Sequence, residues 1–290
     1  MGRDFHDAFP SVRDIFESQA AGFDLREMCF DAPLTELSLT RYTQPCMAAF
    51  AAAVTQLLRE RGYMPDFTAG LSLGEYAALH ASGVFGVDTL LELLAFRGLA
   101  MERSAEGIKS RMSAVLGLSE ALVRQAIAEA QSVGIVAVTN VNCPGQIVIG
   151  GEENAVLEAE KQCAALGARR CLPLNTSGPF HTPLMENASV GLRTKLAQTG
   201  LAPQRIPVVF NATGETAQND EIRELLCGQV KTTVLFEKTI CTLVAFGVDK
   251  IVEIGPGSVL AGFVRKTAPE VRVVSVDKVA DLEKIAELYA

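Results

Sequence analysis

The stretch Gly70-Leu71-Ser72-Leu73-Gly74 follows a short apolar run, Phe67-Thr68-Ala69, and leads into a helix-like segment over residues 75–82. A Gly-x-Ser-x-Gly sequence between a strand and a helix is typical of the nucleophile elbow, a sharp turn that presents a reactive serine. Glycines two residues before and two residues after the serine let the crossing chains approach closely. A plain turn with the same residues is the alternative, and the strand before it and the helix after it favour the elbow.

This turn places the Ser72 hydroxyl at the N-terminus of the following helix. The backbone N–H of Leu73 can donate to an oxyanion there, and the helix dipole favours the negative charge that develops on it. We therefore predict that Ser72 is a nucleophile and that Leu73 contributes to an oxyanion hole.

The composition of the 290-residue chain is that of a globular protein, with 49% hydrophobic and 21% charged residues. It has no run of 18 apolar residues, so we expect no transmembrane helix and no membrane partner. The N-terminus lacks the apolar region of a secretory signal, which favours a cytoplasmic location. A net charge of −8 and a pI of about 5.1 disfavour nucleic acid as a partner.

The seven cysteines are scattered along the chain and never have Cys-x-x-Cys spacing. We therefore expect reduced thiols that form no disulfides. The three histidines are His6, His80 and His181, and no two of them lie four residues apart. This spacing argues against a metal site.

Helix-like and strand-like segments alternate on both sides of a central region. We expect helices over the first thirty residues and over 46–60, 75–82, 87–101, 183–198, 221–226, 237–246 and 258–266. We expect strands over 67–69, 208–210, 251–254 and 271–276. This alternation predicts a parallel sheet with helices on both faces.

The central region has a different order of elements. Strands are expected over 114–116, 135–141, 147–149 and 170–174, with helices over 119–131 and 152–165. This βαββαβ order is that of a ferredoxin-like subdomain. We therefore predict an α/β fold in which residues 1–111 and 178–290 form a large catalytic domain and residues 112–177 form an inserted ferredoxin-like subdomain.

A serine becomes an effective nucleophile only when a base takes its proton. His80 lies eight residues after Ser72, about 12 Å along the same helix, which is too far for contact. His181 lies at the seam between the two predicted domains, where loops often line clefts, and is the candidate base. A role as a helix cap is the alternative. Because no carboxylate stands out as a third member, a backbone carbonyl is the candidate that orients the ring.

Arg97 is a charged residue in an otherwise apolar helix. A guanidinium suits bidentate binding of a substrate carboxylate. The alternative is an arginine that reaches the surface or pairs with Glu92 or Glu102. Asn140, Asn142 and Gln146 lie around the predicted Pro144-Gly145 turn, and turn formation is their simplest interpretation.

Six ordered motifs together identify a family. They are Thr43-Gln44-Pro45, the stretch 70–76, Arg97-Gly98 with Met101, Asn140-Val141-Asn142, Gly178-Pro179-Phe180-His181 and Glu253-Ile254-Gly255-Pro256-Gly257. With these motifs the chain resembles the malonyl-CoA:acyl carrier protein transacylase family, which includes the acyltransferase domains of fatty acid and polyketide synthesis.

The resemblance implies an α/β-hydrolase-like core and a ping-pong transfer of a malonyl group from malonyl-CoA to the phosphopantetheine thiol of holo acyl carrier protein, with no bound cofactor. It implies that Ser72 is the nucleophile, His181 the base and Arg97 the group that holds the malonate carboxylate. The residue whose backbone carbonyl would orient the histidine corresponds to Leu235. The other residues implied in substrate binding are Met101, Asn140, Asn142 and Phe180.

Two departures from the family pattern affect the expected activity. Leu71 occupies the position before the serine, where the family usually has histidine. The family normally begins with a strand and a Gly-Gln-Gly-Ser-Gln loop, and the sequence starts after them, at Met1-Gly2-Arg3. We therefore expect an oxyanion hole with the Leu73 amide alone, and losing one such donor typically lowers the rate about 100- to 1000-fold. A hydrolase of acyl-carrier thioesters and a weakly active docking subunit are the alternatives.

Acyl carrier protein and CoA are both acidic, so their binding calls for basic side chains. The adjacent pairs Arg169-Arg170 and Arg265-Lys266 are candidates. Solvated surface charges are the alternative interpretation of each pair.

Overall fold

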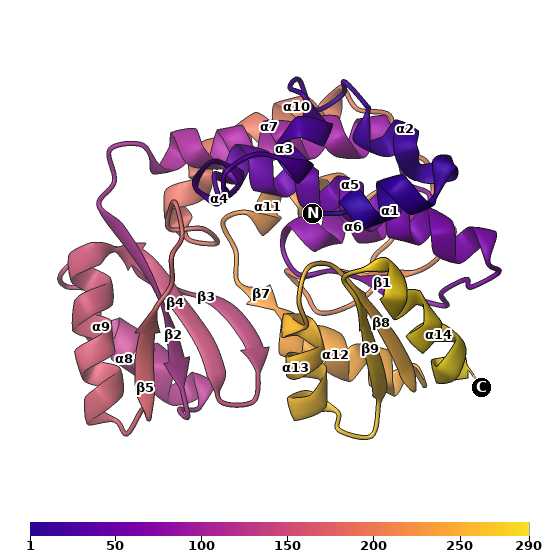
Figure 1. Ribbon diagram of the computed structural model, residues 1–290. Helices are drawn as coiled ribbons and strands as arrows, with labels where there is room; N and C mark the ends of the chain where they lie inside the picture. The colour runs from indigo at the N-terminus through magenta and orange to yellow at the C-terminus, as the bar shows by residue number, and fades with distance from the viewer. Residues whose placement is uncertain (290) are drawn as a thin grey trace. The chain divides into compact units, whose positions relative to one another are not determined.

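The computed structural model describes residues 1–289 and contains two compact units (Figure 1). Unit 1 comprises Met1–Gly98, Thr199–Val209 and Ile240–Ala290, and unit 2 comprises Leu99–Gln198 and Phe210–Thr239. Unit 2 contains the whole of the predicted subdomain 112–177 together with flanking segments. The domain boundaries that we infer from the sequence stay a prediction.

Unit 1 contains two short parallel sheets and most of the helices of the N-terminal third. Its strands are β1 (Thr68–Ala69) paired with β6 (Val208–Val209), and β8 (Lys250–Ile254) paired with β9 (Arg272–Val276). Its helices are α1 (Arg3–Ala8), η1 (Pro10–Val12), α2 (Arg13–Phe16), α3 (Leu25–Phe30), α4 (Leu34–Leu37), α5 (Thr40–Glu60), α6 (Leu73–Ala81), α13 (Val259–Thr267), η3 (Val279–Asp281) and α14 (Leu282–Tyr289).

Unit 2 contains the ferredoxin-like arrangement. Its elements are β2 (Ser110–Leu116), α8 (Glu120–Ala130), β3 (Val136–Cys143), β4 (Gln146–Glu152), α9 (Glu153–Ala165), β5 (Arg170–Pro173), η2 (Pro183–Met185), α10 (Glu186–Ala197), α11 (Ile222–Gln229) and β7 (Val234–Leu235). The sheet has the order β5-β2-β4-β3-β7, in which the first three pairs are antiparallel and β7 runs parallel to β3. The helices α8 and α9 lie together against this sheet (Figure 1).

Two helices, α7 (Val87–Ala105) and α12 (Phe236–Ala245), pass from one unit to the other along the chain. None of the helices among the described residues has the length and apolar character needed to span a bilayer.

The two faces of the unit 2 sheet have different side chains because residues of a strand alternate between faces. Val115, Val138 and Ile149 face a buried apolar cluster with the helices α8 and α9. A smaller cluster of Met112, Ala114 and Val148 has Phe180 packed against it. This second cluster places Phe180 beside the sheet.

The α/β class with a ferredoxin-like insertion is confirmed. The strands expected in one parallel sheet form two separate two-stranded parallel sheets, and the other differences are local. The first thirty residues, which were expected to be helical, form three short α-helices. The helix expected from residue 46 begins at Thr40, so Pro45 lies inside α5. The strand β7 was not expected from the sequence, because a two-residue strand has no periodic pattern to detect.

Candidate active site

The predicted elbow is present in unit 1. Ser72 is the N-cap of α6 and has a φ of 53° and a ψ of −107°, a strained backbone conformation for a residue with a side chain. The backbone N–H of Glu75 donates to the Ser72 carbonyl at 3.1 Å, and that of Gly74 donates to the Leu71 carbonyl at 2.9 Å. Leu73 is the first residue of α6, where a backbone N–H has no acceptor within the helix.

The two glycines of the elbow have unequal roles. A Cβ on Gly70 would lie 2.1 Å from the backbone carbon and oxygen of Gly74, so residue 70 must be glycine. A Cβ on Gly74 would meet nothing within 4 Å. The expectation that both glycines are needed for close approach is therefore wrong for Gly74. Gly70 lies against the backbone of Gly74, and the space where a Cβ of residue 74 would lie is empty.

Arg97 points to the elbow from α7 and is only 1% exposed. Its Nη2 donates to Ser72 Oγ at 3.0 Å, and its Nη1 donates to Gln44 Oε1 at 2.7 Å. The Arg97 Cζ lies 5.5 Å from the centre of the Tyr76 ring. The alternative in which Arg97 reaches the surface is therefore wrong.

The electrostatic setting of Arg97 is unusual for a guanidinium. Burial lowers its pKa from the ordinary value, while the nearby Tyr76 and Glu75 favour the charged form. An arginine pKa starts far above 7, so the group is a cation at physiological pH. A buried cation whose Nη2 contacts Oγ of the predicted nucleophile Ser72 is well placed for an anionic group joined to that oxygen.

His181 lies in unit 2 and is 5% exposed. Its Nδ1 lies 2.9 Å from the Gln229 carbonyl oxygen, and its backbone N–H donates to the Val230 carbonyl at 2.9 Å. Because a carbonyl oxygen only accepts, Nδ1 carries the proton in this contact and Nε2 is left as the basic nitrogen.

The carbonyl that orients His181 is that of Gln229, so the prediction of Leu235 is wrong. Gln229 is the last residue of α11, where the final carbonyls have no helical N–H beyond them and accept from other groups. Leu235 lies in β7, and its carbonyl accepts from the Thr239 hydroxyl at 3.1 Å.

The predicted substrate-binding residues of unit 2 are mostly buried. Asn140 and Asn142 are 8% and 6% exposed on β3, whose pairing with β4 has irregularities between 138 and 140 and between 141 and 143. Asn140 Oδ1 accepts from the Thr139 hydroxyl at 2.9 Å. Asn142 Oδ1 is buried and has no hydrogen-bond partner among the described residues. Met101 is 2% exposed and lies one turn after Arg97 on α7.

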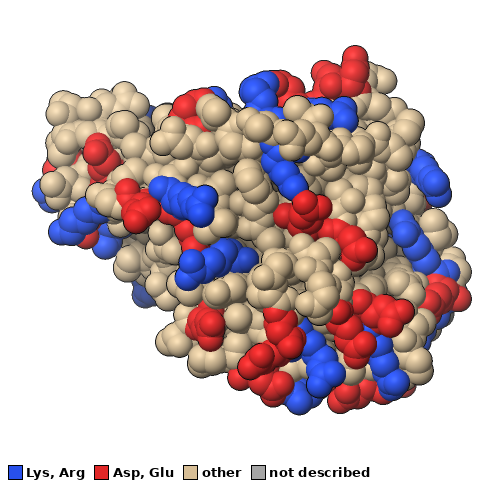
Figure 2. Space-filling model, turned by 90° about the horizontal axis from the view of Figure 1, so that it is seen from above, with Lys and Arg blue, Asp and Glu red and all other residues tan. Residues whose placement is uncertain are grey.

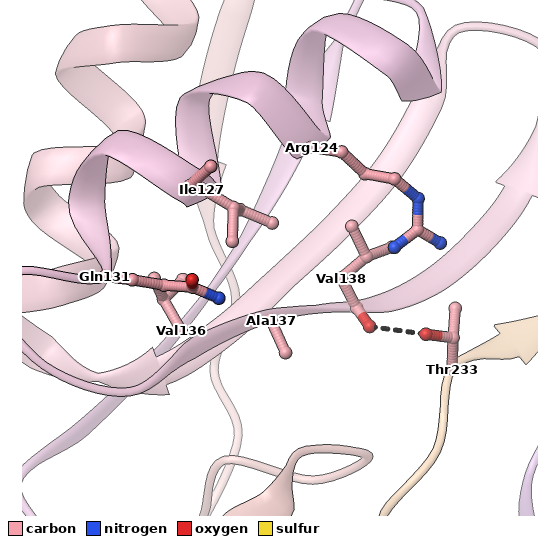
Figure 3. Close-up of a pocket in the computed structure, with 8 residues that line it drawn as sticks. Arg124, Ile127, Gln131, Val136, Ala137, Val138 and Thr233 are labelled. Carbon is pink, nitrogen blue, oxygen red and sulfur yellow. Dashed lines mark hydrogen bonds between the residues drawn. The ribbon is translucent and has the colours of Figure 1, made fainter.

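A separate cavity of about 230 Å³ lies in unit 2 between α8 and β3 (Figure 3). Arg124 extends beside it, and the Thr233 hydroxyl donates to the Val138 carbonyl at 2.8 Å. The eight residues that line this cavity include none of the predicted site residues. Within residues 1–289 there is no group of three or more His, Cys, Asp or Glu side chains that could hold a metal ion.

Charged side chains of both signs are interspersed on the face of the molecule that Figure 2 shows. The residues of the two candidate basic pairs, Arg169-Arg170 and Arg265-Lys266, are exposed. Their role in binding an acidic partner stays a prediction.

The sequence did not predict two groups, one in each unit, that contact the candidate residues. Gln44 lies on α5 and accepts from Arg97, and the sequence signal for it is an amide on the buried face of an apolar helix. The Gln229 carbonyl has no sequence signal, because every residue carries a carbonyl.

Residues 3–285 match the family model of the acyl transferase domain. The malonyl CoA-acyl carrier protein transacylase of Bacillus subtilis is 33% identical over 287 residues, which cover 98% of this chain and 90% of that protein. The structure of MCAT from Streptococcus pneumoniae has 41% identity and a TM-score of 0.95, and covers 99% of this chain and 94% of that one.

A third similar protein was solved with its carrier. PlMCAT, a malonyl-transacylase in complex with the type II PKS acyl-carrier protein AntF, has 34% identity and a TM-score of 0.95. The match covers all of this chain and 94% of that one. The strained Ser72, the buried Arg97 and the oriented His181 thus occur in a chain that, over nearly its whole length, belongs to the acyl transferase family.

Proposed function

We propose that this protein transfers a malonyl group from malonyl-CoA to the phosphopantetheine thiol of acyl carrier protein through an acyl-enzyme on Ser72. The observation that carries the proposal is the contact between Ser72 Oγ and the buried guanidinium of Arg97 at 3.0 Å. Similar proteins named malonyl CoA-acyl carrier protein transacylase support the choice of substrates. The reaction as proposed needs no bound cofactor and takes place in the cytoplasm.

The first half-reaction forms the acyl-enzyme. His181 Nε2 takes the proton of the Ser72 hydroxyl as the oxygen attacks the thioester carbonyl. The N–H of Leu73 donates to the oxyanion, which the dipole of α6 also stabilises. CoA then leaves as its thiol after it takes the proton from His181. In the second half-reaction the carrier thiol attacks the ester by the same steps in reverse.

Arg97 is the proposed carboxylate-binding group. The carboxylate of a malonyl ester is separated from the serine oxygen by one carbonyl carbon and one methylene, so it lies within reach of a guanidinium that touches that oxygen. The pair would be charge-assisted and bidentate. An acetyl group lacks the carboxylate and gains nothing from this contact.

The remaining proposed contacts come from unit 2. Asn142 Oδ1, buried without a hydrogen-bond partner among the described residues, would accept from an amide N–H of the pantetheine arm. Phe180, packed on the sheet, would limit the room beside the α-carbon of the acyl group. Asn140 and Met101 would complete the binding surface.

The test is the intact mass of the protein after incubation with malonyl-CoA. We expect the wild type to gain one malonyl group and Ser72→Ala to gain none. Equal labelling of both proteins would contradict the assignment of the nucleophile. Release of free malonate from the labelled wild type, faster than transfer to holo acyl carrier protein, would instead identify a hydrolase.

A further inference from the structure

The helices α5 and α7 touch at a glycine. A Cβ on Gly98 would lie 2.6 Å from the carbonyl oxygen of Thr40, 2.7 Å from the Cα of Arg41 and 3.0 Å from its backbone nitrogen. All three are backbone atoms of the first turn of α5, which cannot rotate away as a side chain can. Gly98 therefore allows a separation between the helices that no other residue permits.

Local helix formation gives no reason for a glycine at this position. Gly98 lies inside α7 and does not have the left-handed backbone that favours glycine. Glycine inside a helix destabilises it by about 1 kcal/mol relative to alanine. The close approach to α5 is what the glycine contributes.

The same helix pair positions the guanidinium of Arg97. Gln44 lies one turn after Thr40 on α5, and Arg97 directly precedes Gly98 on α7. The hydrogen bond of 2.7 Å from Arg97 Nη1 to Gln44 Oε1 joins residues 53 positions apart, so its length depends on the helix spacing. Gln44 is 3% exposed, so water has little access to replace it as the acceptor for Arg97.

We propose that Gly98 is a positioning residue for acyl-group selection, because the α5–α7 spacing that it permits holds Arg97 where a carboxylated acyl group on Ser72 can be recognised. The proposal rests on the carboxylate-binding role of Arg97. A methyl group at residue 98 must displace the first turn of α5 by about 1 Å, which is enough to break a hydrogen bond of ordinary length. The Arg97 guanidinium would then lose its hydrogen bond to Gln44 Oε1, which fixes its orientation.

The test compares malonyl-CoA with acetyl-CoA as acyl donors in Gly98→Ala. We expect the ratio of kcat/KM for malonyl-CoA to that for acetyl-CoA to fall about 10-fold or more, the typical effect of losing a hydrogen bond to a charged group. The kcat/KM for acetyl-CoA itself should change only a few-fold. A general disturbance of the fold would lower both values together and leave the ratio unchanged.

The matched control is Gly262→Ala on α13. A Cβ at this helical glycine would meet nothing within 4 Å, so the substitution has the same chemistry without the clash. We expect it to leave the ratio unchanged. A wild-type ratio in a folded Gly98→Ala protein would overturn the proposal.

A second variant keeps the proposal testable if Gly98→Ala does not fold. Gln44→Met removes the acceptor and retains the helix spacing, and we expect the same fall in the ratio. An unchanged ratio in Gln44→Met would also overturn the proposal. Arg97→Ala distinguishes the carboxylate-binding role from the positioning role. An unchanged ratio in Arg97→Ala would refute the carboxylate-binding role itself. A collapsed ratio in Arg97→Ala, with wild-type ratios in Gly98→Ala and Gln44→Met, would refute the positioning role alone.

Discussion

Ser72 and His181 have the same kind of backbone conformation but are held in it differently. They are the two non-glycine residues with positive φ among residues 1–289, at 53° and 61°. Such conformations cost about 1–3 kcal/mol each and persist only where the surroundings enforce them. The two proposed catalytic residues are thus the two strained positions, one in each compact unit.

The serine is held by its immediate neighbours in the chain. Gly70 passes against Gly74, and the turn leads directly into α6, so these backbone restraints lie within a few residues. The histidine is held by the C-terminal end of α11, through Gln229, which is 48 residues away, and Val230. Local restraint leaves a motif in the sequence, whereas restraint by a distant backbone leaves none.

The strongest test of the local restraint is Gly70→Ala. Its Cβ would overlap the Gly74 backbone at 2.1 Å, and overpacking of this kind costs about 1–3 kcal/mol or more. Misplacing the nucleophile by about 1 Å lowers the rate about 100-fold. We expect loss of malonyl labelling and a lower midpoint of thermal unfolding. Gly74→Ala, which meets nothing within 4 Å, should label nearly as well as the wild type, and a similar loss in both variants would contradict the unequal roles.

His181→Ala removes the imidazole ring that the distant Gln229 carbonyl orients. We expect malonyl labelling to slow about 100- to 10,000-fold, the usual contribution of a general base. The rate of labelling by mass spectrometry measures this effect. Unchanged kinetics would remove His181 from the mechanism.

His80→Ala is the matched histidine control, and it should label at the wild-type rate. His80 Nδ1 contacts the Phe85 carbonyl at 3.0 Å, and burial lowers the pKa of His80 from its ordinary value. The His80 ring therefore binds a proton more tightly in the unfolded chain than in the folded one. The stability of the wild type should then fall as the pH drops below about 6.5. This part of the pH dependence should be absent from His80→Ala in denaturant titrations at pH 5 and 7.

The smallest effect is expected from Thr182→Val, which alters the loop around the histidine without touching its ring. The Thr182 hydroxyl is buried and donates to the Pro179 carbonyl at 2.6 Å. Removing the hydroxyl leaves the Pro179 carbonyl without this donor, which should lower the free energy of unfolding by about 1–3 kcal/mol. Labelling should slow several-fold. Thr194→Val, on an exposed turn of α10, is the control and should change neither quantity.

Much of the fold was predictable because its signals are local. The βαββαβ order of residues 112–177 follows from segments whose periodicity each lies within about ten residues, and the sheet order β5-β2-β4-β3 agrees with it. The start of α5 and the strand β7 were not predictable. Pro45 inside a helix contradicts local preference, and β7 forms because β3 offers a neighbouring edge.

The sequence by itself predicted the candidate nucleophile, the candidate base and the buried cationic residue, and it determined the family, because each depends on residue type at a given spacing. Only the tertiary structure decided that Arg97 is buried against Ser72 and Gln44, and that Gln229 rather than Leu235 orients His181. The physical reason is that a backbone carbonyl has no side-chain identity, and a helix crossing such as that at Gly98 depends on residues far apart in the chain.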